Sequence, residues 1–208
     1  FRVLCNSRGL LADLFARAGI AAEQHAALFL ALDKRGKLDD AAIADLLAAQ
    51  GLGRPAIDAA FRVMALDSFD AARAFLGADT PAVADLATFF SLAAEHGIGD
   101  RVGFDISIIR GLGYYTGIVF ECFDTARQFR AIFGGGRYNN LLEALGGRPV
   151  PAVGLGFGDV VIAELLAGKN RLPASRDPDR IWIGFMDEPQ RIAAIRLATA
   201  LRREGRHV

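Results

Sequence analysis

Residues 110–121, RGLGYYTGIVFE, combine chemically active side chains with the β-branched and aromatic composition of a strand. We expect Arg110 at the end of a strand, where Gly111 permits a sharp change of backbone direction. An arginine in such a place can bind a phosphate through its planar guanidinium and stabilise charge that develops in a transition state. Taken alone, Arg110 is more simply explained as a surface arginine in a turn, so its interpretation depends on the neighbouring segments.

Two adjacent tyrosines stand in the middle of this stretch. If Tyr114 and Tyr115 lie on a strand, their rings face opposite sides of the sheet, so that one can line a pocket while the other packs. Two core tyrosines are the alternative. Glu121 at the end of the stretch has a surface salt bridge as its simplest explanation.

Glycine-rich segments follow at two places. Residues 134–136 are glycines that precede Arg137 and Tyr138, and we predict a turn that leaves main-chain amides free for a ligand. A plain hairpin is the alternative, and a Walker-type phosphate loop is excluded because no Gly-Lys-Ser/Thr follows. Residues 152–158, AVGLGFG, alternate glycine with apolar residues, as expected where a ligand or another strand crowds a sheet.

The first half of the chain has mainly helical periodicity. Residues 1–5 suit a short strand, and Asn6-Ser7 can cap a helix over residues 9–18. Residues 21–99 then form an all-helical block, in which we find no internal repeat.

Strand patterns prevail after Gly99. We predict antiparallel strands at residues 102–109, 114–123 and 128–133, a helix at 138–145, a strand at 152–157, and a helix from Val160 to residue 167 capped by Asp159. The polar segment that precedes residue 180 suits a linker between domains. After it, a final strand at 180–186 and a helix at 189–204 would form one β-α unit.

Composition limits the range of functions. Positive and negative residues balance at 24 each, so no global field attracts nucleic acid, although a local basic face remains compatible with this balance. Cys5 and Cys122 suit reduced core thiols of a cytoplasmic protein, and the three histidines show no ligand spacing, so we predict no metal site. No apolar run is long enough to span a membrane, and no signal peptide is visible.

In this order and spacing the motifs resemble those of the histidyl-tRNA synthetases, a class II family. Residues 110–117 match its histidine-specific strand, 134–141 its Gly-Gly-Gly-Arg-Tyr-x-x-Leu turn, and 151–154 its Pro-Ala-Val-Gly strand. Residues 1–8, FRVLCNSR, are similar to the segment that follows the second class II motif. The resemblance is strong up to about residue 170 and loose over residues 180–208.

The resemblance implies an α+β fold with an antiparallel six-stranded catalytic sheet, part of which lies in this chain. Residues 1–20 and 100–170 would belong to the catalytic domain, and residues 21–99 to a helical insertion that reaches toward the tRNA acceptor stem. Residues 171–179 would be a linker, and residues 180–208 the start of an α/β anticodon-binding domain.

The resemblance also implies a reaction and its residues. Histidine and ATP would give histidyl-adenylate, and the histidyl group would pass to tRNA(His). Arg110 would be catalytic and contact the α-phosphate. Histidine would be bound by Tyr114, Tyr115, Tyr138, Gly135 and Gly136, and the ATP or adenylate by Arg110, Gly134, Gly154, Gly156 and Gly158. The family further implies Mg²⁺, for which this chain shows no identifiable ligands, a homodimer and a cytoplasmic location without a membrane.

Two departures and one alternative accompany this interpretation. Val161 stands where the family has an arginine that contacts adenine and the γ-phosphate, and Gly113 where many members have aspartate. The alternative is the regulatory subunit of ATP phosphoribosyltransferase, a non-catalytic paralogue that tends to lose the arginine strand. Because the chain begins and ends within apparent strands, we read it as an interior piece of a longer protein and expect no aminoacylation by it alone.

Overall fold

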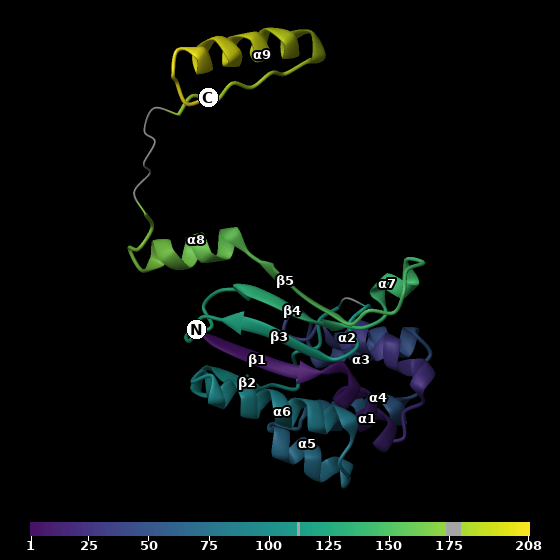
Figure 1. The fold of residues 1–208 in the computed structure, drawn as a ribbon. Coiled ribbons are helices and arrows are strands. Elements are labelled where there is room, and N and C mark those ends of the chain that lie inside the picture. The colour runs from purple at the N-terminus through teal and green to yellow at the C-terminus, as the bar shows by residue number, and fades with distance from the viewer. Residues whose placement is uncertain (112, 174–179) are drawn as a thin grey trace. The chain divides into compact units, whose positions relative to one another are not determined.

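The computed structural model describes residues 1–111, 113–173 and 180–208, and the chain forms two compact units, Phe1–Leu165 and Leu166–Val208 (Figure 1). The first unit consists of a five-stranded sheet and a set of helices that pack against it. The second unit contains one long helix. Among the described residues no helix is long and apolar enough to cross a membrane.

The sheet has the strand order β2-β1-β3-β4-β5. Its strands are β1 (Arg2–Ser7), β2 (Val102–Phe104), β3 (Ile118–Phe123), β4 (Phe133–Tyr138) and β5 (Ala152–Phe157). Three of the four pairings are antiparallel, which confirms the predicted α+β class with a mainly antiparallel sheet.

The pairing of β1 with β2 is parallel, so the prediction of an antiparallel strand beginning at Val102 was wrong. The chain leaves β1, passes through the whole helical block and returns at the edge of the sheet in the same direction as β1. Such a crossover yields a parallel pair, whereas a tight hairpin yields an antiparallel one. The strand also ends at Phe104, because the side chain of Asp105 accepts a hydrogen bond from the amide of Ser107 at 2.9 Å and turns the chain.

Helices fill the interval between β1 and β2. They are α1 (Arg8–Arg17), α2 (His25–Leu32), α3 (Asp40–Ala49), α4 (Arg54–Met64), α5 (Phe69–Leu76) and α6 (Pro81–Glu95), with short 3-10 turns at Ala22–Gln24 and Gly99–Arg101. Four of these helices begin at a residue whose side chain accepts a bond from the helix amides: Ser7, Asp39, Ser68 and Thr80. These caps replace the backbone acceptors that a first helical turn lacks.

One apolar core joins these helices to the sheet. Leu10, Leu14 and Phe15 on α1 are fully buried and pack with residues of α2 to α6. Ile118 of β3 packs against the same core, and α1 and α6 contact the strands (Figure 1). The helices therefore cover one face of the sheet, which leaves the opposite face for other contacts.

Strands β3 and β4 differ from their predicted ranges. Residues 114–117 are in a turn and an extended segment outside the sheet, and β3 begins at Ile118. Residues 128–132 are not a strand, whereas the glycines of residues 134–136 lie inside β4 and not in a turn. The sequence pattern therefore predicted the wrong ranges for both strands. Strand β4 is hydrogen-bonded on both sides, by β3 and by β5, and this ladder tolerates glycine.

The last elements of the first unit agree better with their predicted ranges. Strand β5 spans the predicted residues. Helix α8 (Asp159–Gly168), which continues into the second unit, has Asp159 as its first residue, one position before the predicted start. Helix α7 (Leu141–Ala144) is one turn, shorter than predicted.

The second unit contains α9 (Glu188–Arg203), which begins after Asp187, whose side chain accepts a bond from the amide of Gln190 at 3.1 Å. The predicted strand at residues 180–186 is not formed. A single backbone bond joins Ile181 to His207 at 2.9 Å, because no second strand in the described part of this unit completes a ladder. Most of the predicted linker, residues 174–179, lies outside the described residues.

Candidate active site

The site is built on the sheet face that the helices do not cover. Cross-strand pairing places Glu121, Gly134 and Gly156 in one row across β3, β4 and β5. The next row contains Val119, Gly136 and Gly154. Because directly paired residues share a face, these four glycines form a floor without side chains beside the carboxylate of Glu121.

Arg110 projects over this floor. Its Nη1 donates a hydrogen bond to Oε1 of Glu121 at 2.6 Å, and the two side chains are 23% and 25% exposed. Partial burial lowers the pKa of Arg110, but the hydrogen bond and charge of Glu121, together with Tyr115, outweigh burial, so the pKa stands above its usual value. The buried Nε has no hydrogen-bond partner among the described residues. The guanidinium is therefore held in place by Glu121.

The loop that carries Arg110 is positioned from two directions. The fully buried amide of Asn6 donates to the carbonyl of Ile106 at 2.9 Å. At Gly111, a methyl group would lie 2.6 Å from Oδ2 of Asp33, so the loop passes close to the end of α2. Arg110 itself has a φ of 61°, in the left-handed region. The predicted strand end at Arg110 was wrong. The chain does bend at Gly111, as predicted, and the absence of a side chain there also leaves room for Asp33.

Three tyrosine rings gather beside Arg110. The ring centroids of Tyr114 and Tyr115 are 4.7 Å apart, and that of Tyr138 lies 5.3 Å from the first and 6.2 Å from the second. The prediction that the adjacent tyrosines face opposite sides of a sheet was wrong, because neither belongs to a strand. Tyr115 is 7% exposed and packs with Leu4, while Tyr114 is 36% exposed at the surface of the cluster.

A hydrogen bond with Tyr115 is the main cause of a raised pKa at Tyr114, and partial desolvation and the other phenol of the cluster, Tyr138, add to it. The hydroxyls of the cluster are thus close enough to influence one another. An apolar wall that carries polar tips is suited to hold a flat, polar ring.

The glycines of β4 make room for these side chains. A methyl group at position 134 would lie 2.7 Å from Nη1 of Arg110, and one at position 136 would lie 2.8 Å from Cδ1 of Tyr115. On β5, a methyl group at position 154 would lie 2.8 Å from the hydroxyl of Tyr138. The sequence pattern predicted glycines that admit a ligand, and the structure shows that they first admit the site's own side chains.

Three other predicted glycines are placed differently. Gly156 has open space above it, with no atom within 4 Å of an added methyl group. Gly158 follows β5 and donates its amide to the carbonyl of Ile132 at 2.8 Å. Gly135 pairs with Leu155 and faces the covered side of the sheet, so the structure does not bring it to the face of Arg110.

A cavity of about 1040 Å³ opens next to the Arg110–Glu121 pair. One wall is the turn after α2, from Asp33 to Lys37, and the other is the loop between β3 and β4 with Arg127 and Arg130. Sequence reasoning did not single out either wall, because neither contains a motif. Only the fold brings them together.

The β3–β4 loop is held by the buried carboxylate of Asp124, which accepts hydrogen bonds from the amides of Gln128 at 3.2 Å and Phe129 at 3.1 Å. Desolvation acts to raise the pKa of Asp124, but the backbone hydrogen bonds outweigh it and lower that pKa below its usual value. An aspartate followed by a short polar run is a recognisable signal for such a turn.

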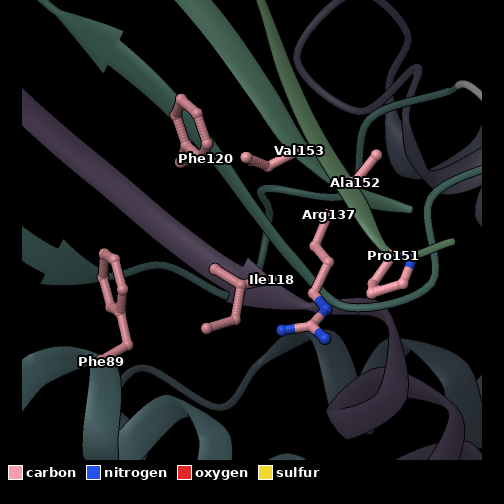
Figure 2. A pocket seen from close by; sticks show the side chains of 7 residues that line it. All are labelled: Phe89, Ile118, Phe120, Arg137, Pro151, Ala152 and Val153. Atoms are coloured by element: carbon pink, nitrogen blue, oxygen red, sulfur yellow. The ribbon is translucent and has the colours of Figure 1, made fainter. Parts of the chain in front are cut away.

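A second cavity lies on the covered face of the sheet, with a volume of about 450 Å³ (Figure 2). Figure 2 shows Phe89, Ile118, Phe120 and Val153 around it, with Arg137 extending between Ile118 and Pro151. Arg137 is the one titratable residue in its lining, and its Nε already donates to Asn139 at 3.1 Å. The chemistry of the Arg110 face is absent from this cavity.

Comparison with known proteins decides the family. The sequence profile described as "Histidyl-tRNA synthetase" matches residues 2–158, three quarters of the chain. The chain belongs to the histidyl-tRNA synthetase family. The resemblance inferred from residues 110–117, 134–141 and 151–154 is thereby confirmed.

Curated relatives agree with this assignment. The chain is 39% identical to the chloroplastic/mitochondrial histidine–tRNA ligase of Arabidopsis thaliana over 203 residues, which are 98% of the chain and 42% of that protein. It is 37% identical to histidine–tRNA ligase of Halobacterium salinarum over 212 residues, 100% of the chain and 48% of that protein. The chain thus spans less than half the length of these relatives. Their shared name does not favour the regulatory-subunit alternative.

Among solved structures, histidyl-tRNA synthetase from Nostoc sp. PCC 7120 has a TM-score of 0.71 at 23% identity, covering 100% of this chain and 51% of that one. A Bacillus halodurans structure described as ATP phosphoribosyltransferase regulatory subunit/histidyl-tRNA synthetase has a TM-score of 0.62 at 22% identity, covering 100% of this chain and 52% of that one. Both similarities show the fold alone and confirm the synthetase fold class.

The structure places the two positions at which the sequence is expected to depart from the family pattern, Val161 and Gly113. Val161 lies in the first turn of α8, with Cγ2 3.5 Å from a methyl group built on Gly158. Gly113 lies in the turn before Tyr114 and has open space around it.

A metal site within the chain would need a cluster of protein ligands. Among the described residues, no group of three or more His, Cys, Asp or Glu is arranged to hold an ion. Cys5 and Cys122 are buried and unbonded, and burial raises the pKa of Cys5 to about 12. Both cysteines therefore lie in the core as protonated thiols at neutral pH.

Proposed function

We propose that the whole protein to which this chain belongs attaches histidine to tRNA(His) through a histidyl-adenylate. One observation carries the proposal: the guanidinium of Arg110, held by Glu121 at 2.6 Å, lies over a glycine floor beside a tyrosine cluster. A fixed cation next to space without side chains suits a phosphate ester, and the adjoining phenols suit an imidazole. The family assignment supports the same reaction.

In the first step, the carboxylate of histidine attacks the α-phosphorus of ATP and pyrophosphate leaves. Negative charge builds up on the α-phosphate oxygens during this attack. Arg110 stabilises that charge, and it does so without reorganisation because Glu121 already orients it. In the second step, a ribose hydroxyl at the tRNA 3′ end attacks the acyl carbonyl and AMP leaves.

Histidine recognition is assigned to the tyrosine cluster. The hydroxyls of Tyr115 and Tyr138 bind the imidazole, and Tyr114 completes the wall from its exposed side. Gly136 leaves space beneath Tyr115. Gly135 faces the other side of the sheet, so only its main-chain atoms are assigned to the site.

ATP and the adenylate are assigned to the glycine floor. Gly134, Gly154 and Gly156 lie on the face of Arg110, and Gly158 lies at the end of the same strand. Mg²⁺ prefers carboxylate oxygens and substrate phosphates. The carboxylate beside Arg110 is already paired, and the described residues form no cluster of three ligands, so no step is assigned to the ion.

Further properties of the whole protein are proposed from the family. They are a homodimer, a cytoplasmic location, and the division into catalytic domain (1–20 and 100–170), helical insertion (21–99), linker (171–179) and anticodon-binding domain (from 180). The helices between β1 and β2 support an insertion within the catalytic domain, and the edge strand β5 with exposed Val153, Leu155 and Phe157 supports further protein at that edge of the sheet.

The proposed reaction is tested by pyrophosphate exchange. The whole protein should exchange labelled pyrophosphate into ATP only when histidine is present, and should charge a tRNA(His) transcript. Residues 1–208 alone should do neither, because the described residues hold one arginine at the glycine floor and no complete nucleotide site. Exchange by the whole protein that proceeds equally with another amino acid would contradict the proposed substrate.

Removing single hydroxyls tests the histidine pocket. Tyr115→Phe and Tyr138→Phe should each raise the KM for histidine by roughly 10- to 100-fold, since a buried polar ligand group then lacks its partner. The KM for ATP should change much less. Phe129→Leu, outside the cluster, is the control. An unchanged histidine KM in both tyrosine variants would remove the cluster from the pocket.

A further inference from the structure

The cavity beside Arg110 carries an excess of positive charge. Its lining includes five cationic residues and two acidic ones, Asp33 and Glu121, among the described residues. The cationic residues are Arg35, Lys37, Arg110, Arg127 and Arg130. The whole chain is neutral, with 24 residues of each sign, so this excess is a local feature.

Three of the five cations are already neutralised within the fold. Arg110 is paired with Glu121 at 2.6 Å, Arg35 with Asp40 at 3.0 Å, and Arg127 with Asp105 at 3.2 Å. Lys37 and Arg130 form no ion pair with another described residue, and both are exposed. They stand on opposite walls, Lys37 on the turn after α2 and Arg130 on the β3–β4 loop.

We propose that Lys37 and Arg130 bind backbone phosphates of the tRNA 3′ end and guide it along this cavity to Arg110. The inference rests on the proposed function, because acyl transfer needs the terminal ribose next to the adenylate. Phosphate contacts from lysine and arginine position a nucleic acid without reading its sequence.

An RNA strand fits the observations better than the triphosphate of ATP. Small-molecule sites usually measure about 300–1,000 Å³, and this cavity, at about 1040 Å³, is slightly larger than that range. Exposed cations on two separate segments suit a strand that passes between them. The partly buried Arg110 at the inner end remains the contact for the α-phosphate.

The test compares the whole protein with its Lys37→Ala/Arg130→Ala double variant. The matched control is Arg17→Ala/Arg62→Ala, which removes two exposed cations that do not line the cavity. The probe is a fluorescein-labelled tRNA(His) transcript, with its Kd measured from low to moderate salt. We expect the double variant to bind roughly tenfold more weakly at low salt, and its plot of log Kd against log salt to lose about 0.7 in slope for each contact. The control should change little.

Pyrophosphate exchange separates the two sources of phosphate. A rise in the KM for ATP that exceeds the rise in the tRNA Kd would overturn the proposal in favour of the triphosphate. Equal tRNA binding by the variant and the control would also overturn it. If the wild type showed no histidine-dependent exchange while tRNA binding still depended on Lys37 and Arg130, the proposed function would fail and the phosphate contacts would stand. Circular dichroism of both variants checks that they are folded.

Discussion

Arg110→Ala should slow histidyl-adenylate formation in the whole protein by roughly 100- to 1,000-fold, the loss expected when a preoriented charge contact to a transition state is removed. The reason is the geometry of the pair. Glu121 holds Nη1 at 2.6 Å, and Nε has no hydrogen-bond partner among the described residues. Single-turnover formation of the adenylate, measured by rapid quench, reports this step directly. A wild-type rate in the variant would refute the catalytic role.

The backbone of Arg110 needs a control of its own. Its φ of 61° lies in the left-handed region, which glycine adopts without cost and other residues rarely adopt. Arg110→Gly therefore removes the side chain and relieves the backbone at once. Both variants should lose activity equally if the guanidinium is what matters. Recovery in the glycine variant alone would assign the loss to the loop conformation. Arg62→Ala, on the exposed surface of α4, controls for the loss of one charge.

Gly136→Ala should destabilise the catalytic unit by about 1–3 kcal/mol, as overpacking of a filled site does. The added methyl group would lie 2.8 Å from both Cδ1 of Tyr115 and Cγ1 of Val119, and the latter is fully buried. Both neighbours are buried, so a shift of either side chain disturbs its own packing contacts. Thermal unfolding of the whole protein should shift downward by roughly 2–4 °C for each kcal/mol. Because Tyr115 must be displaced, the KM for histidine should rise as well.

Gly156→Ala is the matched control for this prediction. Gly156 lies on the same face of the sheet in the neighbouring strand, and an added methyl group there meets no atom within 4 Å. Its melting temperature should stay at or above that of the wild type, since alanine restricts the unfolded chain more than glycine does. Equal destabilisation at both positions would show that the face as a whole, and not the contact with Tyr115, requires glycine.

The membership of the site could be predicted better than its geometry. Arg110, Tyr115 and Tyr138 were assigned to the site because their motifs resemble those of the family, and the structure places them around one floor, with their roles still to be tested. The partner of Arg110 was missed, because Glu121 on its own suggested a surface salt bridge. Asn6 was interpreted as a cap and instead ties down the loop before Arg110. The contact between Asn6 and Ile106 joins residues a hundred positions apart, so no local sequence pattern predicts it.

The sequence by itself determined the features that depend on near neighbours along the chain. The helix start at Ser7 follows from capping chemistry within one turn, and β5 follows from alternation within a single strand. The order and spacing of three motifs were enough to assign the family.

The tertiary structure alone decided which segments pair and which face they share. The glycines of residues 134–136 look like a turn in isolation and become part of the inner strand β4 because β3 and β5 supply hydrogen bonds on both sides. The long return through the helical block made β2 parallel to β1. The same pairing put Arg110 and Tyr115 over positions where no side chain stands, and the physical reason is that cross-strand register, unlike a helix cap, is set by residues far apart in the chain.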